Sequence, residues 1–348
     1  MSPRTITPAA LVTFAIDVLT SAGADHASAE ATAAALLHAS LHGVDSHGIR
    51  LIPWYADGLR AGSVMGKPVI TVSTPRRAAA QVHADGGLGH LPAYRAMDEA
   101  CTIARDCGIG MAGVIHATHY GAAGTYALAA AEAGFIGFVT SNCTALVVPH
   151  GGASPMHGTN PIALAAPRQA GEPFLLDMAT SSIPWNRVLN SRTEGLELQP
   201  DAALDATGAF TRDATAATML GPLGGALFGH KGAGLAGLAD ILGGVLTGMR
   251  ISTGQDPKAP CDTELGFFMM AIDPATFVAV EVFFAGMDRY FAAMAARSTP
   301  ERPVYVAGGP QWIARREREA HGIPIPNGLH HALAEAAAKA GVPTLRYR

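Results

Sequence analysis

Residues 45–50 read Asp-Ser-His-Gly-Ile-Arg and follow a segment that consists almost entirely of alanine, leucine and histidine. The histidine of this stretch, His47, can accept or donate a proton near neutral pH. Arg50 lies about one helical turn further along and can hold a carboxylate through two parallel hydrogen bonds. Tyr55 adds a phenol to the same region of the chain. Together, these side chains are suited to proton transfer at the α-position oxygen or nitrogen of a small carboxylic acid.

Composition restricts the class of protein. At 348 residues the chain is long for one core, so two or three subdomains are expected. Hydrophobic residues make up 49% of the chain and charged residues 15%, which leaves few charges to cover a monomer. Because excess apolar surface usually meets a partner subunit, we expect a homo-oligomer. The net charge of −4, without a basic cluster, argues against nucleic acid as a ligand.

The sequence also bears on cellular location. The four cysteines form no Cys-x-x-Cys pair, which fits a reducing cytoplasm. The first residues contain no apolar segment typical of a signal peptide. The longest apolar runs contain Asp240 and Glu281 and are rich in glycine, so they read as buried core rather than membrane spans. We therefore expect a cytoplasmic protein without a membrane partner.

Hydrophobic periodicity and turn residues predict an α/β chain, with Thr7 as the N-cap of the first helix. Helices are expected at residues 7–23, 27–42, 51–62, 92–106, 125–133, 230–248, 276–297 and 327–340. Strands are expected within residues 68–83 and at 110–115, 136–141, 160–166, 174–176 and 266–272, and residues 185–205 read as a helix and a polar loop. We predict an N-terminal helical subdomain (1–75), a central α/β domain (76–298) and a C-terminal segment (299–348) that packs on the N-terminal helices.

Two glycine-rich segments are candidates for phosphate binding. Residues 108–113 spell Gly-x-Gly-x-x-Gly, but a predicted helix precedes them and a predicted strand follows. A Rossmann dinucleotide loop requires the reverse order, so we reject this segment. Residues 119–124, His-Tyr-Gly-Ala-Ala-Gly, do lie between a predicted strand and a predicted helix, where a phosphate can approach backbone N–H groups. A tight turn would need the same small residues, so both interpretations stay open.

Histidine pairs raise the possibility of a metal. His116 and His119 have His-x-x-His spacing, and His38 and His42 lie one helical turn apart. A zinc site needs a third ligand and supporting groups, and neither pair has a Cys, Asp or Glu at convincing spacing. Core or loop histidines are therefore favoured, and we predict no metal. A zinc hydrolase built on the first pair is kept as a distant alternative.

Three further motifs have two interpretations each. The side chains of Ser46 and His47 should diverge by about 100° on a helix or 180° on a strand, so a serine nucleophile with an adjacent base is not expected. Asp177 ends a short apolar strand, where it either orients the His47 imidazole or caps a helix. Residues 230–232, His-Lys-Gly, open a predicted helix that either meets a phosphate or packs closely on a neighbour.

Read together, six segments resemble the type-2 malate/L-lactate dehydrogenase family, which includes ureidoglycolate, sulfolactate and 2,3-diketogulonate enzymes and Δ1-piperideine-2-carboxylate reductases. They occur in the family's order. The matching segments are residues 43–48 (Gly-Val-Asp-Ser-His-Gly), 119–124, 158–161 (Gly-Thr-Asn-Pro), 176–181 (Leu-Asp-Met-Ala-Thr-Ser), 230–235 (His-Lys-Gly-Ala-Gly-Leu) and 271–274 (Ala-Ile-Asp-Pro).

The resemblance implies a non-Rossmann NAD(P)-binding α/β fold, with a central mixed sheet and a helical subdomain formed by the two termini. It implies a homodimer with active sites near the subunit interface. His47 would be the proton donor and acceptor at the substrate, supported by Ser46 and Asp177. The substrate-binding residues would be Arg50, Tyr55, His119 and Thr159. The cofactor-binding residues would be His119, Tyr120, Gly121, Ala122, Ala123, Asp177, Met178, Ala179, Arg187, His230, Lys231 and Gly232.

The sequence therefore predicts an oxidoreductase that transfers a hydride between NAD(P)H and C2 of a small 2-oxo or 2-hydroxy acid or a cyclic 2-imino acid. Arg187 and Arg192 favour NADP over NAD, because a 2′-phosphate needs a basic partner. The alternative is a non-catalytic ligand-binding or structural oligomer with the same fold. Two departures from the family pattern motivate it: Arg50 lies three residues after His47 instead of four, and residues 307–310 read Ala-Gly-Gly-Pro instead of Pro-Gly-Glu.

Overall fold

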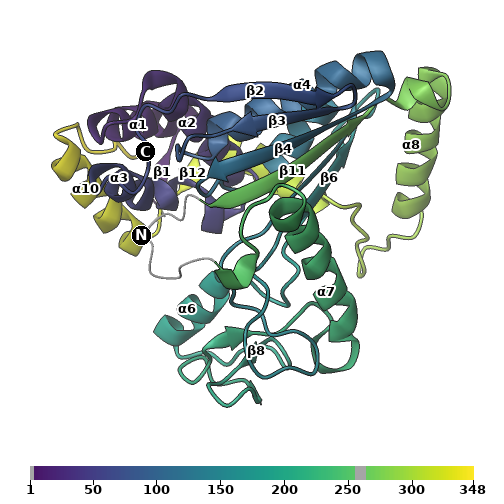
Figure 1. The fold of residues 1–348 in the computed structure, drawn as a ribbon. Helices are drawn as coiled ribbons and strands as arrows, with labels where there is room; N and C mark the ends of the chain where they lie inside the picture. Colours follow the sequence, from purple (N-terminus) through teal and green to yellow (C-terminus); the bar gives the residue numbers. More distant parts are fainter. Residues whose placement is uncertain (1–3, 255–263) are drawn as a thin grey trace.

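A seven-stranded sheet forms the centre of the computed structural model, which describes residues 4–254 and 264–348 (Figure 1). Its strand order is β2-β3-β4-β11-β5-β6-β7. Strands β3 and β4 run parallel, whereas the other neighbouring pairs are antiparallel, so the sheet is mixed as predicted. The strands are β2 (Thr71–Arg76), β3 (Ala79–His83), β4 (Ile109–Ala117), β5 (Ile136–Ser141), β6 (Ile162–Ala166), β7 (Phe174–Met178) and β11 (Leu265–Ile272).

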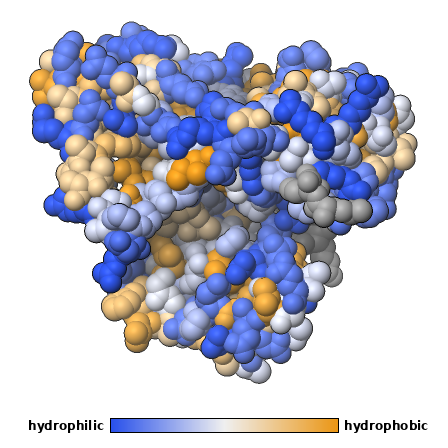
Figure 2. Space-filling model, turned by 180° about the vertical axis from the view of Figure 1, so that it is seen from behind, coloured by the Kyte–Doolittle hydropathy of each residue, from blue (hydrophilic) through white to orange (hydrophobic). Residues whose placement is uncertain are grey.

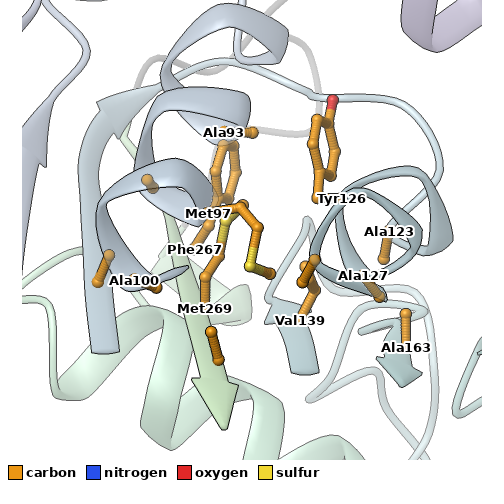
Figure 3. Packing of buried hydrophobic residues seen from close by; sticks show 14 of the residues in the cluster. Ala93, Met97, Ala100, Ala123, Tyr126, Ala127, Val139, Ala163, Phe267 and Met269 are labelled. Carbon is orange, nitrogen blue, oxygen red and sulfur yellow. The ribbon is translucent and has the colours of Figure 1, made fainter. Parts of the chain in front are cut away.

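The main core lies between this sheet and two helices, α4 (His90–Cys107) and α5 (Gly124–Glu132). In Figure 3, Met97 of α4 lies against Phe267 and Met269 of β11, and α5 packs beside them. Because side chains alternate along a strand, Gly266 faces the opposite side of the sheet. There a Cβ atom would overlap the carbonyl oxygen of Gly243, so the absence of a side chain permits a close approach.

A second core joins the two ends of the described chain. It is built by α1 (Pro8–Ser21), α2 (His26–Leu41), α3 (Ile52–Arg60) and α10 (Asn327–Ala340), with Leu11, Leu36 and Leu333 among its buried side chains. The short strands β1 (Thr5–Ile6) and β12 (Ile323–Pro324) pair antiparallel at its edge. Thr7 caps α1 as predicted, since its side chain accepts a hydrogen bond from the backbone of Ala10.

Helix α9 (Gly309–His321) connects the two cores. Trp312 belongs to the core of the sheet, and its indole donates a hydrogen bond to the Pro173 carbonyl. At the other end of the helix, Arg318 donates to the Asp45 carboxylate at 2.9 Å and to the Ser40 carbonyl at 2.6 Å. Helix α9 therefore holds the chain immediately before His47 in place.

A third lobe lies below the sheet in Figure 1. It holds α6 (Trp185–Glu194), α7 (Gly225–Ala239) and a small sheet of β8 (Ala203–Leu204), β9 (Phe210–Thr211) and β10 (Met219–Leu220). The sequence predicted a helix and a polar loop for residues 185–205 but no sheet, because two-residue strands are too short to show an alternating pattern. The prediction that a helix opens at residue 230 was also wrong: α7 begins five residues earlier.

Helix α7 does not continue to Gly248 as predicted. It passes into a π-helical turn, Asp240–Val245, which lies against β11 and β5. Beyond the sheet, α8 (Val280–Ala295) projects away from the body with no buried residue, held by an ion pair between Arg168 and Asp288 (Figure 1). The rear view in Figure 2 shows apolar patches on the upper body and on the lower lobe. Among the described residues, no helix is long and apolar enough to cross a membrane.

We predict that Gly266→Ala destabilises the protein by about 1–3 kcal/mol, because the new methyl group forces the π-helical turn away from β11. Urea unfolding measures the change. The control is Gly328→Ala in the first turn of α10, where a Cβ atom meets nothing within 4 Å. The control should change stability by less than about 1 kcal/mol. Equal effects of the two substitutions would contradict the close approach at Gly266.

Candidate active-site cleft

His47 lies in a tight turn, Asp45–His47, that follows α2. A Cβ atom at Gly48 would overlap the Ser40 hydroxyl, so the glycine lets this turn fold directly onto α2. The Ser40 hydroxyl then accepts a hydrogen bond of 3.0 Å from the backbone N–H of Ile49. The turn is therefore held from α2 on one side and from α9 on the other, which restricts the position of the imidazole.

Ser46 and His47 are hydrogen-bonded to each other, with 2.8 Å between the hydroxyl and Nδ1. The expectation that neighbouring side chains diverge was wrong here, because the chain forms neither an α-helix nor a strand but a 3-10 turn. The bond occupies one ring nitrogen and leaves Nε2 for another partner. Ser46 therefore contacts the imidazole directly, and the supporting role in catalysis that the resemblance implies stays a prediction.

His119 is the second imidazole of the site. Its Nδ1 accepts a hydrogen bond of 3.3 Å from the backbone N–H of Gly121, and the Tyr55 hydroxyl lies 2.6 Å from the same nitrogen. A backbone N–H can only donate, so Nδ1 is the acceptor and Nε2 carries the proton of the neutral ring. The rings of His47 and His119 are stacked, with centroids 5.6 Å apart.

Tyr55 was predicted to hold the substrate carboxylate. The structure instead places it fully buried in α3, with its ring edge-on to His90 at 5.0 Å and its hydroxyl on His119. It lines neither of the cavities described below. Its geometry therefore assigns it to the orientation of His119 rather than to direct contact with a substrate.

Burial controls the charge of both imidazoles. It lowers the pKa of His47 to about 4, and the positive charge of Arg50 lowers it further in the same direction. Burial also lowers the pKa of His119 well below the ordinary value, with smaller contributions from His47 and His90. Both rings are therefore neutral at pH 7. A neutral ring presents one donor and one acceptor, so the pair can accept a proton and hold an oxygen atom at the same time.

Two cavities meet at these imidazoles. The inner cavity, of about 230 Å³, is lined by Tyr120, Gly121, Ala122, Ala123, Ser141, Asn142, Pro161, Asp177, Met178 and Leu265. The outer cavity, of about 550 Å³, is lined by Leu51, Trp54, Thr144, Leu146, Trp185 and Asn186. Both cavities share Ser46, His47, His119, Cys143, Thr159, Ala179 and Pro184. The cleft therefore offers two adjoining compartments with His47 and His119 at their junction.

Asp177 ends β7 and lines the inner cavity. It accepts a hydrogen bond from the backbone of Gly124 at the first turn of α5, and burial raises its pKa to about 6 despite that bond. Ser46 occupies Nδ1 of the His47 ring, so the predicted orienting role of Asp177 finds no support at that nitrogen and stays a prediction. The N-cap interpretation was wrong, because Asp177 lies in β7 and the next helix, α6, has Pro184 as its N-cap.

The glycine-rich segments behave as the sequence predicted. Residues 108–113 end α4 and enter β4, so they cannot form a Rossmann loop. The 119–124 turn does connect β4 to α5, and five of its residues line the inner cavity. The two histidines of the His-x-x-His pair separate: His116 contacts Glu264 and His83, whereas His119 faces the cleft. Among the described residues, no cluster of three or more metal-ligating side chains is present.

Besides Tyr55, five predicted site residues lie outside both cavities. Arg50 and Arg187 are exposed, although their chain neighbours Leu51 and Asn186 line the outer cavity. The remaining three occupy the first turns of α7, away from the cleft lining. The His230 ring contacts His150, the Lys231 ammonium lies 5.3 Å from the Phe228 ring centre, and Gly232 is buried against Leu223.

The sequence analysis missed several residues of the cleft. Ser141 ends the apolar strand β5 and Asn142 and Cys143 follow it directly, so a polar run in that position could have been recognised. The oxygen of the Asn142 side chain has no hydrogen-bond partner among the described residues. Leu265 and Trp54 had no such signal, because an apolar residue in the sequence gives no indication of which cavity it borders.

Comparisons with known proteins agree with this architecture. The sequence model of the malate/L-lactate dehydrogenase family matches residues 6–334. The malate dehydrogenase of Pyrococcus abyssi is 36% identical, with 96% of this chain and 94% of the relative covered. The ureidoglycolate dehydrogenase (NAD(+)) of Escherichia coli K12 is 31% identical, with 90% of each covered.

Solved structures show the same fold. The malate dehydrogenase of Pyrococcus horikoshii OT3 superposes with a TM-score of 0.89 and 34% identity, covering 99% of this chain and 98% of the other. The Δ1-piperideine-2-carboxylate reductase of Pseudomonas syringae pvar. tomato gives 0.87 and 28%, covering 96% and 99%. The mixed α/β fold with a two-compartment cleft therefore defines a nicotinamide-dependent dehydrogenase or reductase. The chain belongs to the malate/L-lactate dehydrogenase family.

We predict that Tyr55→Phe lowers kcat/KM by about 10–100-fold, because the His119 ring loses the hydroxyl that holds Nδ1. Steady-state kinetics measures the effect. Tyr94→Phe is the matched control, since Tyr94 also lies outside the cleft lining and packs edge-on against a buried ring, but that ring belongs to Tyr126 and not to an imidazole of the site. Equal activities of the two variants would show that Tyr55 does not orient His119.

Proposed function

We propose that the protein transfers a hydride between NAD(P)H and C2 of a small 2-oxo or 2-hydroxy acid, or of a cyclic 2-imino acid. The observation that carries this proposal is the meeting of two compartments at a pair of neutral imidazoles. One compartment can take the reactive ring of a cofactor and the other a small acid. The relatives named as malate and ureidoglycolate dehydrogenases, and the structural neighbour named as a cyclic imino acid reductase, support the substrate class.

The inner cavity fits a nicotinamide ring. Ala122, Pro161, Met178 and Leu265 give it apolar walls, and the Asn142 oxygen beside it is a buried acceptor still without a partner among the described residues. The 119–124 turn at the first turn of α5 would receive a phosphate of the dinucleotide. A nicotinamide bound there supplies the hydride for C2, and the protein supplies position and protons.

His47 moves the proton in this proposal. During oxidation of a hydroxy acid, Nε2 of the neutral ring accepts the hydroxyl proton, while Ser46 holds Nδ1. During reduction, the protonated ring returns that proton to the oxygen or nitrogen on C2. His119 donates from its Nε2–H to the same substrate atom or to the carboxylate, and Thr159 offers a hydroxyl to both cavities. The contact of Arg50 with the carboxylate stays a prediction.

The preference for NADP rests on α6. Arg187 is exposed one residue beyond Asn186 of the outer cavity, so its guanidinium is available to a 2′-phosphate. Arg192 is less available, because its guanidinium donates to the Ala214 carbonyl and lies over the Trp185 ring. We also favour a cytoplasmic location, which the free thiols of Cys101, Cys107 and Cys143 support. Cys261 lies outside the described residues.

We propose a homodimer with the cleft near the interface. An apolar face runs along α7 and the π-helical turn, where the exposed side chains are Leu227, Phe228, Leu235, Leu238, Ile241, Val245 and Leu246. Helix α8, which projects beyond the sheet, adds a second apolar surface with Val280, Val282 and Tyr290 exposed. A second copy of the chain is the partner that best accounts for two such surfaces on one molecule.

The assay that tests the function follows the absorbance of NADPH and NADH with pyruvate, oxaloacetate, phenylpyruvate, 2,3-diketogulonate and Δ1-piperideine-2-carboxylate. We expect turnover with at least one of them and a higher kcat/KM with NADPH. His47→Asn should lower kcat by about 100-fold or more, since proton transfer at C2 is lost. Turnover within a few-fold of the parent enzyme would exclude His47 as the proton donor. Nicotinamide binding without any turnover would favour the non-catalytic alternative.

The pH dependence follows from the depressed pKa of His47. Because the neutral ring is the base, oxidation should stay fully active at neutral pH and decline only as pH falls toward about 4. Reduction needs the protonated ring, so its kcat/KM should decrease about tenfold per pH unit above that pKa. Profiles of both directions over the same pH range provide the measurement. Identical slopes in the two directions would contradict this assignment.

The dimer prediction is tested by sedimentation. Leu246→Lys should raise the dimer dissociation constant by at least about 30-fold, because an unpaired charge enters an apolar interface. Val69→Lys replaces a similarly exposed apolar side chain just before β2, away from α7 and the π-helical turn in the chain, and should leave assembly unchanged. Dimers that withstand Leu246→Lys would show that the interface lies elsewhere. A monomeric parent chain would contradict the dimer altogether.

A further inference from the structure

A buried carboxylate lies behind one wall of the cleft. Asp240, the first residue of the π-helical turn, is 5% exposed. Its Oδ2 accepts hydrogen bonds from Nδ1 of His157 at 2.8 Å and from the Asn160 amide at 3.1 Å. Its Oδ1 accepts from the Asn142 amide at 3.3 Å and from the backbone and hydroxyl of Ser252 at 2.9 and 2.8 Å. These five residues are called the Asp240 hub.

The hydrogen bonds keep this carboxylate ionised. Burial by itself would raise the pKa of Asp240, but the bonds from His157, Ser252 and Asn142 lower it below its usual value. All the hub groups that face the carboxylate are donors, and His157 is the titratable one among them. A neutral side chain of the same shape would leave at least one of these donors without an acceptor, which is costly in a buried site.

The hub residues adjoin the cleft along the chain. Asn142 lies between Ser141 and Cys143, and all three residues border the inner cavity, while Asn160 follows Thr159. The Asn160 side chain also accepts a hydrogen bond of 3.1 Å from the backbone of Cys143, so it joins the two loops to each other. The side chains of Asn142 and Asn160, which the hub holds, therefore determine where their neighbours Cys143 and Thr159 lie in the cleft.

Backbone strain gathers at the same place. Asn160 is fully buried and has a φ of 31°, a conformation that costs free energy for a residue with a side chain. Its amide donates to the Ala236 carbonyl and to Asp240, and these bonds hold the strained conformation. Strain of this kind persists where the surrounding structure over-determines it, and such places are common at functional sites.

The π-helical turn is shaped to meet these loops. A Cβ atom at Gly243 would lie 2.9 Å from the backbone nitrogen of Asn142, and one at Gly244 would lie 3.0 Å from its amide nitrogen. Two consecutive glycines therefore let the turn pack directly on the loop that follows β5. The widened turn places the Asp240 carboxylate at the point where the two loops and Ser252 converge.

We propose that Asp240 is a positioning residue for the reaction: its buried carboxylate fixes the loops 141–143 and 157–161, and thereby the places of Cys143 and Thr159 in the cleft. The proposal rests on the proposed function, because it assigns Asp240 an effect on that site. A residue that served the overall fold alone would change stability and leave the cleft of the folded enzyme as it is. The two roles are therefore separable by experiment.

The first variant is Asp240→Asn, which keeps the volume and turns one acceptor into a donor that faces other donors. The matched control is Thr247→Val, in the same segment of chain. Thr247 is buried, and its hydroxyl donates to the carbonyls of Gly243 and Gly244 within the turn rather than to either loop. Both variants are measured below the unfolding temperature of each, so that stability differences do not enter.

Thiol reactivity reports the loop positions without any turnover. Cys143 is half-buried with its sulfur 3.4 Å from the Thr159 hydroxyl, and Cys107 on α4 is an internal reference. Alkylation by iodoacetamide is followed for each peptide by mass spectrometry. In Asp240→Asn the rate at Cys143 relative to Cys107 should rise about tenfold, because the loops open locally. In Thr247→Val the ratio should stay within about twofold of the parent.

Kinetics completes the test. Asp240→Asn should lower kcat/KM by about 100-fold with a raised KM for the acid, since Thr159 is displaced. Thr247→Val should stay within about twofold of the parent. A pattern in which Asp240→Asn lowers the melting temperature but matches the control in thiol reactivity and kcat/KM would overturn the proposal. If the parent shows no turnover but the thiol ratio responds, the loop positioning stands and the proposed function fails.

A second pair of variants covers the case in which Asp240→Asn does not fold. His157→Leu removes one donor to the carboxylate, whereas His157→Asn keeps an amide N–H near the position of Nδ1. The thiol ratio should rise in His157→Leu and return toward the parent value in His157→Asn. Equal ratios in these two variants would show that the hydrogen bond to Asp240 does not position the loops.

Discussion

The partial burial of two imidazoles side by side in the cleft wall is the constraint on which the rest of the site depends. Removal from water makes the charged form of each ring unfavourable, so His47 and His119 are both neutral at pH 7. Neutral rings have directional donors and acceptors, which must be set by partners. Ser46 and Tyr55 provide these partners, one from the adjacent position and one from a distant helix. The chemistry of the cleft follows from this arrangement.

The cleft lies where separate parts of the chain meet. His47 comes from the turn that follows α2 of the helical core. His119 follows the end of β4, an inner strand of the sheet, and the outer cavity also includes Trp185 of the lower lobe. Each core buries its own apolar side chains, so the cleft walls that the two cores form are closely packed and rigid. The ion pair of Arg318 with Asp45 and the Tyr55–His119 bond then set the two imidazoles against each other.

Departures from ordinary local structure gather along one wall. Asn160 has a left-handed backbone, Asp240 is a buried carboxylate, and a π-helical turn replaces the regular end of α7. Each of these costs free energy and needs compensation from its neighbours. In this protein the three features compensate one another. The Asp240 carboxylate accepts a hydrogen bond from the strained Asn160, and the π-helical turn places that carboxylate beside Asn160. The wall is thereby rigid, which is what a site for two ligands requires.

The sequence by itself determined the α/β class, the mixed order of helices and strands, the turn between β4 and α5, and His47 as the central side chain. These features follow from local patterns: periodicity, glycine position and the order of short motifs. Tertiary structure alone decided that Tyr55 holds His119 across 64 positions and that Asp177 meets the backbone of Gly124 at the first turn of α5. It also decided that the lower lobe forms a sheet from two-residue strands. Such contacts depend on how distant segments pack, and no local pattern encodes the distance between them.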